Sequence, residues 1–149
     1  MPIDEQLIQK AKDVMAHAYC PYSKFPVGVA LLSSTGAVFV GANNENASYG
    51  GTICAERTAM CTALSAGERD FEAIAVVTQL AEPAACCGLC RQFLVEHGDM
   101  RVILASTTSD KVVKTTLFEL LPGAFTPKSL KTHASEQLQA HDAFHGASQ

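Results

Sequence analysis

The sequence predicts an α/β domain in which helices flank a mixed sheet of about five strands. Three observations predict this class. The apolar patterns run in the order helix, two strands, then strands alternating with helices, as in sheets with helices on their faces. The chain has 149 residues, a length that suits one domain. It contains no internal repeat and no linker, so we expect residues 1–149 to form a single domain.

The first third of the chain contains one helical pattern and two strand patterns. Apolar residues recur at helical spacing from Asp4 to Ala18, and Asp4 is suited to the N-cap position. Two prolines end this pattern. Two β-rich segments follow, Val27–Leu32 and Val38–Gly41, and a Ser-Ser-Thr-Gly turn joins them.

Helices and strands alternate over the rest of the chain. The predicted elements are a helix Cys54–Ala66 ended by Gly67, a strand Ile74–Thr78, a helix Cys87–His97 ended by Gly98, two strands Val102–Ala105 and Val112–Thr115, and a short helix Leu117–Leu121. After Pro127 the pattern weakens. We expect residues 131–149 to form a tail that is part helix and part frayed end.

The charge balance and the N-terminus argue against several classes of protein. The net charge is -4, the pI is about 5.7, and no run of lysine or arginine occurs. Nucleic-acid binding normally needs a basic stripe, so no nucleic-acid partner is expected. The start MPIDEQLIQK lacks the features of a signal peptide, and no apolar stretch reaches the roughly 20 residues of a membrane helix. We therefore expect a cytoplasmic location, where the six cysteines would serve metal binding or catalysis rather than disulfides.

Three of these cysteines stand at the starts of predicted helices. Cys87 and Cys90 form a C-x-x-C pair at one helix start, and Cys54 lies at another. The partial positive charge at a helix N-terminus lowers thiol pKa values and favours thiolates. Two such helix starts that face one another would present three thiolates to one ion, and zinc suits sulfur ligands.

The number of ligands points to a catalytic rather than a structural zinc site. Structural sites are normally closed by four protein ligands, whereas catalytic sites keep one position for water. Glu56 follows Cys54 by two residues, so it is placed to face the open position as a proton carrier. Three thiolates make the ligand shell negative, and Arg57 is the candidate cation that would offset this charge, with Arg91 as an alternative.

Other uses of the cysteines remain open from the residues alone. A C-x-x-C pair also occurs in structural zinc sites and in redox pairs. A structural site would need a fourth ligand from Cys86, Cys20 or His97, and none of these has suitable spacing. A redox pair would leave Cys54 and Glu56 without a role. Cys61, two helical turns after Cys54, is expected to be a small core residue.

The motif C-A-E followed by C-x-x-C resembles the signature of the zinc-dependent nucleoside and nucleotide deaminases. The likeness spans about residues 5–130 and is most specific to the small homotetrameric cytidine deaminases. It rests on four segments: AYCPYSKFPVG (Ala18–Gly28), NNENASYGGTICAERTA (Asn43–Ala59), CGLCRQ (Cys87–Gln92) and ELLPGAF (Glu119–Phe125). Two departures occur: Ala85-Cys86 stands where this family commonly has Ser-Pro, and Ala42 stands where cysteine is frequent.

The resemblance implies a three-layer α/β/α fold, a homotetramer and a role for each residue of the site. The implied zinc ligands, one ion per subunit, are Cys54, Cys87 and Cys90, with Glu56 as general acid and base and Arg57 behind the sulfurs. The implied substrate contacts are Phe25 stacked on the pyrimidine, Asn43 and Glu45 on the ribose, the Ala55 N–H on the base carbonyl, and Phe125 in the pocket of a neighbouring subunit.

The implied reaction is hydrolytic deamination of cytidine and 2′-deoxycytidine to uridine and 2′-deoxyuridine, with release of ammonia, in pyrimidine salvage. In this mechanism a zinc-bound hydroxide attacks C4 while Glu56 shuttles protons. Three alternatives remain: a nucleic-acid or nucleotide deaminase, a deaminase of the blasticidin type, and a non-catalytic zinc-stabilised interaction module. The FPVG and N-x-E-N segments favour a free nucleoside.

Overall fold

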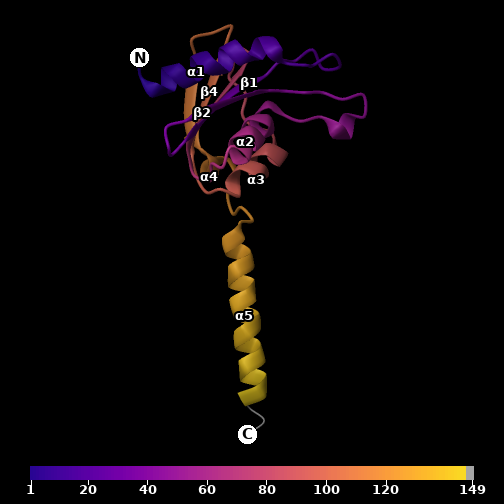
Figure 1. Ribbon diagram of the computed structural model, residues 1–149, viewed down its shortest axis with the longest axis vertical. Helices are drawn as coiled ribbons and strands as arrows, with labels where there is room; N and C mark the ends of the chain where they lie inside the picture. The colour runs from indigo at the N-terminus through magenta and orange to yellow at the C-terminus, as the bar shows by residue number, and fades with distance from the viewer. Residues whose placement is uncertain (147–149) are drawn as a thin grey trace.

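A five-stranded mixed sheet forms the centre of the computed structural model, which describes residues 1–146 (Figure 1). The strand order is β2-β1-β3-β4-β5. The β3–β4 pair is parallel and the other three pairs are antiparallel. The strands are β1 (Gly28–Ser33), β2 (Val38–Ala42), β3 (Phe71–Thr78), β4 (Arg101–Ser106) and β5 (Val112–Thr116). The predicted mixed sheet is confirmed.

Helices cover both faces of the sheet, which gives the three layers that the resemblance implies. One face carries α1, and the other carries α2, α3 and α4. The helices are α1 (Ile3–Val14), α2 (Ala55–Ser65), α3 (Gly88–Val95), α4 (Leu117–Leu120) and α5 (Pro127–Gly146), with short 3-10 turns at Met15–His17 and Tyr49–Gly51. No described helix is long and apolar enough to cross a membrane.

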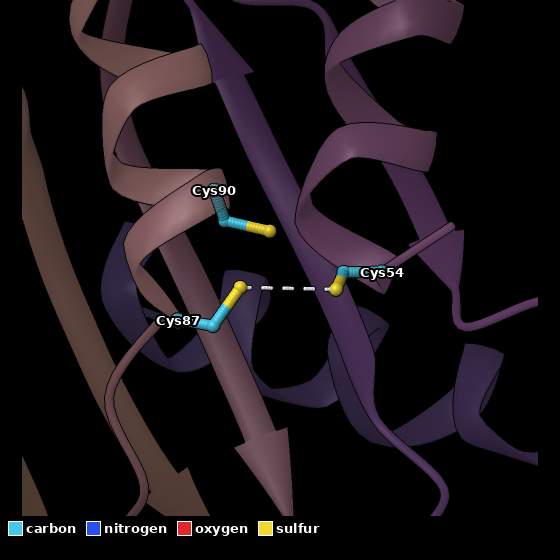
Figure 2. Close-up of side chains that lie close together, drawn as sticks. All are labelled: Cys54, Cys87 and Cys90. Atoms are coloured by element: carbon cyan, nitrogen blue, oxygen red, sulfur yellow. Dashed lines mark hydrogen bonds between the residues drawn. The ribbon is translucent and has the colours of Figure 1, made fainter. Parts of the chain in front are cut away.

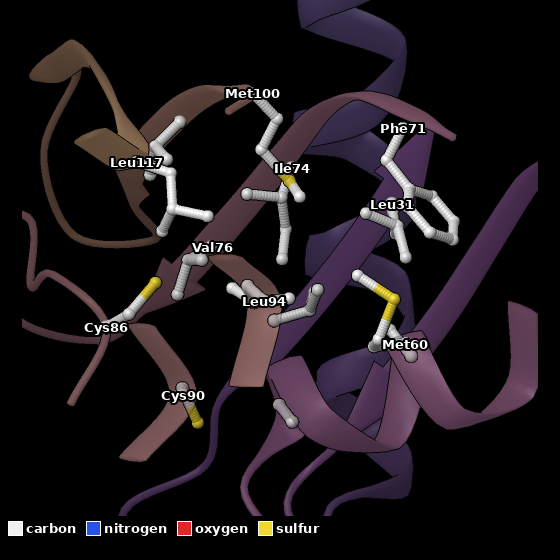
Figure 3. Packing of buried hydrophobic residues seen from close by; sticks show 14 of the residues in the cluster. Leu31, Met60, Phe71, Ile74, Val76, Cys86, Cys90, Leu94, Met100 and Leu117 are labelled. Carbon is white, nitrogen blue, oxygen red and sulfur yellow. The ribbon is translucent and has the colours of Figure 1, made fainter. Parts of the chain in front are cut away.

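The alternation of side chains along the central strands divides the core in two. Successive residues of a strand point to opposite faces, and all six residues of β1 are buried. Leu31 and Ile74 face α2 and α3, where they join Met60 and Leu94 (Figure 3). The alternate residues of the same strands, such as Ala30 and Ala75, face α1 and pack with Leu7. Burial on both faces explains why these strands read as apolar runs rather than alternating patterns.

Glycines let both helical layers approach the sheet closely. A Cβ on Gly28 would lie 1.9 Å from the carbonyl oxygen of Ala11 in α1, and one on Gly41 would lie 2.5 Å from the backbone nitrogen of Ala59 in α2. A real Cβ would push either helix outward. The Gly41 contact matters for function because it sets the position of α2, whose first residues carry the predicted site.

The first helix differs from its prediction in one respect. Pro2, not Asp4, is the N-cap of α1, and Asp4 lies in the first turn. Its carboxylate is turned toward the sheet, where Oδ1 lies 2.8 Å from Arg101 Nη1 and Oδ2 lies 2.8 Å from Lys114 Nζ. Asp4 therefore fastens α1 to β4 and β5 instead of capping its own helix.

The C-terminal segment is more regular than the sequence predicts. A part-helical, part-frayed tail was expected over residues 131–149, whereas α5 is one helix of 20 residues from Pro127 to Gly146. Residues 147–149 lie outside the described residues. Figure 1 shows α5 extending away from the α/β layers rather than packing on them.

Candidate active site

Two helix starts meet at a cluster of three thiols. Cys54 is the N-cap of α2, Cys87 is the N-cap of α3, and Cys90 lies in the first turn of α3. Figure 2 shows the three side chains pointing toward one another. Their sulfur atoms all lie within 4.8 Å of each other, and Sγ of Cys54 is 3.9 Å from Sγ of Cys87. The predicted meeting of the two helix starts is confirmed.

The thiol cluster fits a soft, tetrahedral metal ion. The hydrogen bond from the Cys90 thiol lowers the pKa of Cys54 to about 5, and the Arg57 guanidinium contributes to this shift. Donation of that hydrogen bond and burial raise the pKa of Cys90. These contacts favour the thiolate form of Cys54, and three sulfur donors at this spacing match the ligand preference of zinc. Within residues 1–146, these three residues are the only group found with metal-ligand geometry.

A cavity of about 300 Å³ opens beside the thiols. Its lining combines cysteines, carboxylates, an aromatic ring and small residues. The lining residues are Ser23, Phe25, Val27, Asn43, Glu45, Thr52, Cys54, Ala55, Glu56, Val76, Thr78, Ala84, Ala85 and Cys87. Cys90 is buried behind this surface, while Cys54 is half-buried and Cys87 is exposed.

Glu56 is a buried carboxyl group at the base of the cavity. Glu56 lies in the first turn of α2 and is only 6% exposed. Burial raises its pKa above the usual glutamate value, and the neighbouring Cys54 thiolate adds to this effect. The Cys90 thiol lies 3.4 Å from Oε2 of Glu56. A carboxyl group with a raised pKa accepts a proton more readily than an exposed glutamate, which suits a group that takes up and passes on protons.

Arg57 contacts the sulfur cluster from behind, and Arg91 does not. Nη2 of Arg57 lies 3.8 Å from Sγ of Cys54 and 3.4 Å from the carbonyl oxygen of Thr52. Arg91 instead donates to the carbonyl oxygens of Cys86 and Leu120, both at 2.7 Å. Arg91 thus ties the C-x-x-C loop to α4. Of the two predicted candidates, the geometry favours Arg57.

The three predicted base and ribose contacts, Phe25, Asn43 and Glu45, line the cavity together. Asn43 is engaged on both sides of its amide: Oδ1 accepts from the Val27 N–H and Nδ2 donates to the Phe25 carbonyl oxygen, each at 2.9 Å. This buried side chain therefore fixes the backbone on both sides of Pro26. Sequence reasoning missed this bracing role.

Backbone donors orient the Glu45 carboxylate. Its Oε1 accepts from the N–H groups of Tyr22 and Ser23, at 3.1 and 3.0 Å. Hydrogen bonds from Ser23 and Tyr22 lower the pKa of Glu45, so this carboxylate stays ionised. Ser23 and Thr52 also line the cavity and were not predicted. Ser23 lies in the quoted PYSKF segment, whereas no pattern in the sequence singles out Thr52.

Other predicted residues lie outside the cavity of their own chain. Phe125 is not among the lining residues found in the described part of the chain; it is 58% exposed, and its carbonyl oxygen accepts from Gln92. His97 packs edge-on against Phe71, with ring centroids 5.8 Å apart. The prediction that Cys61 is a core residue is wrong, because its side chain is exposed on α2. Cys86 is the core thiol instead, at 1% exposure.

Comparisons with known proteins agree with this geometry. Residues 1–106 match the model of the cytidine and deoxycytidylate deaminase zinc-binding region. The chain is 47% identical to a cytidine deaminase of Sporosarcina psychrophila over 135 residues, which cover 89% of this chain and 98% of that protein. It is 43% identical to a probable cytidine deaminase of Dictyostelium discoideum over 89% of this chain and 90% of that protein.

A solved structure shows the same fold. The crystal structure of cytidine deaminase from Burkholderia pseudomallei superposes with a TM-score of 0.78 at 48% identity, covering 81% of this chain and 98% of that one. Sequence, fold and thiol cluster agree, and the chain belongs to the cytidine and deoxycytidylate deaminase family.

Proposed function

We propose that this protein hydrolyses cytidine and 2′-deoxycytidine to uridine and 2′-deoxyuridine with release of ammonia. One observation carries the proposal: three thiols at metal-ligand spacing and a buried carboxyl group of raised pKa lie beside one cavity. Free nucleosides are the substrates of pyrimidine salvage, which we propose as the setting. Six free cysteines fit a reducing compartment such as the cytoplasm.

Cys54, Cys87 and Cys90 would hold the zinc ion through three thiolates. When bound there, zinc supplies the activation of water and the stabilisation of developing negative charge. Arg57 offsets part of the charge of the sulfur cluster through its contact with Cys54. The N–H groups of the first turns of α2 and α3 have no helical acceptor, and they offset more.

Glu56 carries the protons of the reaction. As a carboxylate it takes a proton from the attacking water, and as a carboxylic acid it donates to N3 of the pyrimidine when the ring loses aromaticity. The carboxylate then takes the second proton from the oxygen now bonded to C4 and delivers it to the amine at C4, so the carbonyl forms as the C4–N bond breaks and ammonia leaves. Burial suits this cycle because it raises the pKa of Glu56, which makes the carboxyl group a better proton acceptor than an exposed glutamate.

The remaining side chains orient the nucleoside. Phe25 would stack on the pyrimidine ring, and the N–H of Ala55, at the first position of α2, would bind the base carbonyl. Asn43 and Glu45 would bind the ribose, chiefly its 3′-hydroxyl. A grip on this hydroxyl tolerates loss of the 2′-hydroxyl, which explains why both sugars are proposed as substrates.

The exposure of Phe125 and the uncharged parts of the cavity lining support a homotetramer and a nucleoside substrate. In a homotetramer, Phe125 of a neighbouring subunit would help to close the cavity, and its 58% exposure leaves it available for this contact. No lysine or arginine occurs among the described residues that line the cavity. A phosphate would therefore meet no cation there, and a nucleoside is favoured over a nucleotide or a nucleic acid.

An ultraviolet assay of the zinc-loaded protein with cytidine and with 2′-deoxycytidine tests the proposal. We expect loss of cytosine absorbance on both substrates, and loss of that activity after zinc chelation. Parallel assays use a cytosine-containing oligonucleotide and blasticidin S. Faster turnover of either of these would overturn the choice of substrate. No turnover of any cytosine nucleoside by a zinc-loaded, folded protein would leave the non-catalytic zinc module as the better reading.

A further inference from the structure

The loop between β3 and α3 forms one wall of the cavity. It starts after Thr78, which lines the cavity, and it returns to the cavity at Ala84 and Ala85, shortly before Cys87. Residues 79–86 contain no helix or strand, and no backbone–backbone hydrogen bond is found for them in the described part of the chain. Regular secondary structure therefore does not fix this wall.

The turn between β4 and β5 lies beside this loop. β3 and β4 are parallel strands, and the last pair of their register is Thr78 with Ser106. The chain therefore leaves both strands at the same edge of the sheet. The Thr107 N–H donates to the Thr78 carbonyl oxygen at 3.0 Å, which holds the two connections together where they begin.

Two hydroxyl groups of this turn donate to the backbone of the loop. Oγ1 of Thr108 donates to the carbonyl oxygen of Gln79 at 2.8 Å, and Oγ of Ser109 donates to the carbonyl oxygen of Ala81 at 2.6 Å. Both carbonyl groups belong to exposed residues. The two bonds therefore fasten the outer part of the loop, residues 79–81, to the turn.

The buried Ser106 side chain orients the residues that carry these hydroxyl groups. Ser106 is 2% exposed, and its Oγ accepts from the N–H groups of Thr108 and Ser109, at 2.9 and 3.2 Å. An ion pair of Lys111 with Glu82 also joins the turn to the loop, but exposed pairs of this kind contribute little. The hydroxyl groups are therefore the main link between the turn and the loop.

The other end of the loop has anchors of its own. The Cys86 side chain is buried in the core at 1% exposure, and its carbonyl oxygen accepts from Arg91 Nε at 2.7 Å. The wall residues Ala84 and Ala85 lie between these anchors and the hydroxyl groups of the turn. Without the hydroxyl groups, the free part of the loop would begin near the end of β3 instead of after Ala81.

We propose that Thr108 and Ser109 are positioning residues for nucleoside binding, which hold the wall at Ala84 and Ala85 in the conformation that receives the cytosine ring. A loop that adopts this conformation for only part of the time lowers the apparent affinity by that fraction. Neither Thr108 nor Ser109 is among the described residues that line the cavity, so the effect falls on binding rather than on chemistry. The inference rests on the proposed function, because it concerns the same cavity.

Steady-state kinetics of the zinc-saturated Thr108→Val/Ser109→Ala variant test the proposal. We expect KM for cytidine to rise about 3–10-fold, as for the loss of two neutral hydrogen bonds at the lower end of their usual strength, with kcat unchanged. KM for 2′-deoxycytidine should rise by the same factor, because the wall lies beside the thiols and not at the sugar. Ser135→Ala is the control: its Oγ also donates to a carbonyl oxygen, that of Lys131, but it lies on α5. A double variant with the wild-type KM, or with only kcat reduced, would overturn the proposal.

Two measurements on the same variant separate a loose wall from a weakened fold or a damaged metal site. Chymotrypsin should cleave faster after Leu80, which is 49% exposed and lies between the two fastened carbonyl groups, while cleavage after the exposed Leu89 of α3 stays unchanged. Zinc affinity by chelator competition should equal that of the wild type, because Cys87 keeps the anchors at Cys86. Faster cleavage at both leucines, or weaker zinc binding, would assign the hydroxyl groups a general structural role instead. A wild-type protein with no turnover of cytidine would contradict the proposed function, whereas equal cleavage after Leu80 in both proteins would contradict this inference alone.

Cys86→Pro tests the same loop from its other end. Proline restricts its own φ and also the backbone of Ala85 before it, so it should limit the freedom that loss of the hydroxyl groups creates. The position accepts proline, because the Cys86 N–H donates to no group found in residues 1–146 and this family commonly has Ser-Pro there. We expect Cys86→Pro to bring KM of the double variant back toward the wild-type value and to change the wild-type KM little. The same factor in both backgrounds would show that the two changes act independently, and the proposal would then be wrong.

Discussion

Sγ of Cys54 lies 3.9 Å from Sγ of Cys87, although 33 residues separate them in the chain. Each residue is the N-cap of a helix, and the two helices pack side by side on one face of the sheet. The cluster therefore exists only because β3, which runs between the two helices in sequence, brings α3 back beside α2. The site depends on the fold rather than on a local loop.

The neighbouring cysteines Cys86 and Cys87 should differ sharply on substitution. We expect Cys87→Ala to lose zinc and turnover, because its sulfur belongs to the group of three thiols with metal-ligand spacing. Cys86→Ala should keep both, because its thiol is buried in the core beside Val76 and α3 (Figure 3). The small cavity it leaves should lower the free energy of unfolding by about 1–2 kcal/mol. Atomic emission measures the zinc content of each variant, an activity assay measures its turnover, and a denaturation curve measures its free energy of unfolding. Loss of zinc from Cys86→Ala would place the ligand set one residue out of register.

Substitution of Glu56, the proposed proton carrier, should separate chemistry from metal binding. We expect Glu56→Gln to keep its zinc and its fold, because the amide is nearly isosteric with the carboxyl group and Glu56 is not a ligand. Its kcat should fall by about 10²–10⁴-fold, the usual contribution of a general acid–base group. Steady-state rates and metal analysis on the same preparation test this. A variant with the wild-type rate would remove Glu56 from the mechanism.

The guanidinium behind the sulfur cluster should control zinc affinity. Arg57→Ala removes the contact at 3.8 Å with Sγ of Cys54 and one of the causes of its lowered pKa. We expect zinc affinity, measured by chelator competition at neutral pH, to fall about 10–100-fold. Arg57→Lys is the matched variant: it keeps the charge but loses the fork, so its affinity should be intermediate. Equal affinities in all three proteins would show that the contact has no influence on the metal.

The bracing role of Asn43 predicts a combined effect on stability and substrate binding. Asn43→Ala leaves the Val27 N–H and the Phe25 carbonyl without their side-chain partners. The expected cost in unfolding free energy is about 1–3 kcal/mol. KM should rise as well, because Phe25 loses its fixed position. Glu45→Gln is the comparison: it should raise KM for both nucleosides with a smaller change in stability, since Glu45 is more exposed. An Asn43→Ala protein with unchanged stability would contradict the bracing role.

Local patterns predicted the elements well and the long-range contacts poorly. The helix and strand cores follow from apolar periodicity, and the ends of α2 and α3 follow from Gly67 and Gly98, which both have positive φ. The three candidate metal ligands could be recognised in the sequence because each is a cysteine and each lies at the start of a predicted helix. The role of Asp4 could not be recognised in the sequence, because its ion-pair partners lie 97 and 110 residues away. Cys61 was misplaced for a related reason: periodicity gives a helix face, but only packing decides whether that face is covered.

The ion pairs of Asp4 predict a pH dependence of stability. Hydrogen bonds from Lys114 and Arg101 lower the pKa of Asp4 below its usual value. The unfolded chain therefore binds this proton more readily, and the stabilising contribution is complete above the ordinary aspartate pKa of about 3.9. It is lost as the pH falls through the lowered value. Because both partners are largely exposed, we expect Asp4→Asn to cost only about 0.5–1 kcal/mol at pH 7.

Urea denaturation at pH 7 and at successively lower pH values below about 4 would measure this contribution. The difference between wild type and Asp4→Asn should shrink toward zero as the pH falls, since a protonated Asp4 no longer attracts Arg101 and Lys114. Glu5→Gln is the matched control, because Glu5 occupies the same exposed turn of α1 and forms no ion pair among the described residues. Its effect on the helix dipole should be similar, so any larger loss in Asp4→Asn reports the attachment of α1 to the sheet. Equal losses in the two variants would show that the ion pairs add nothing beyond the dipole.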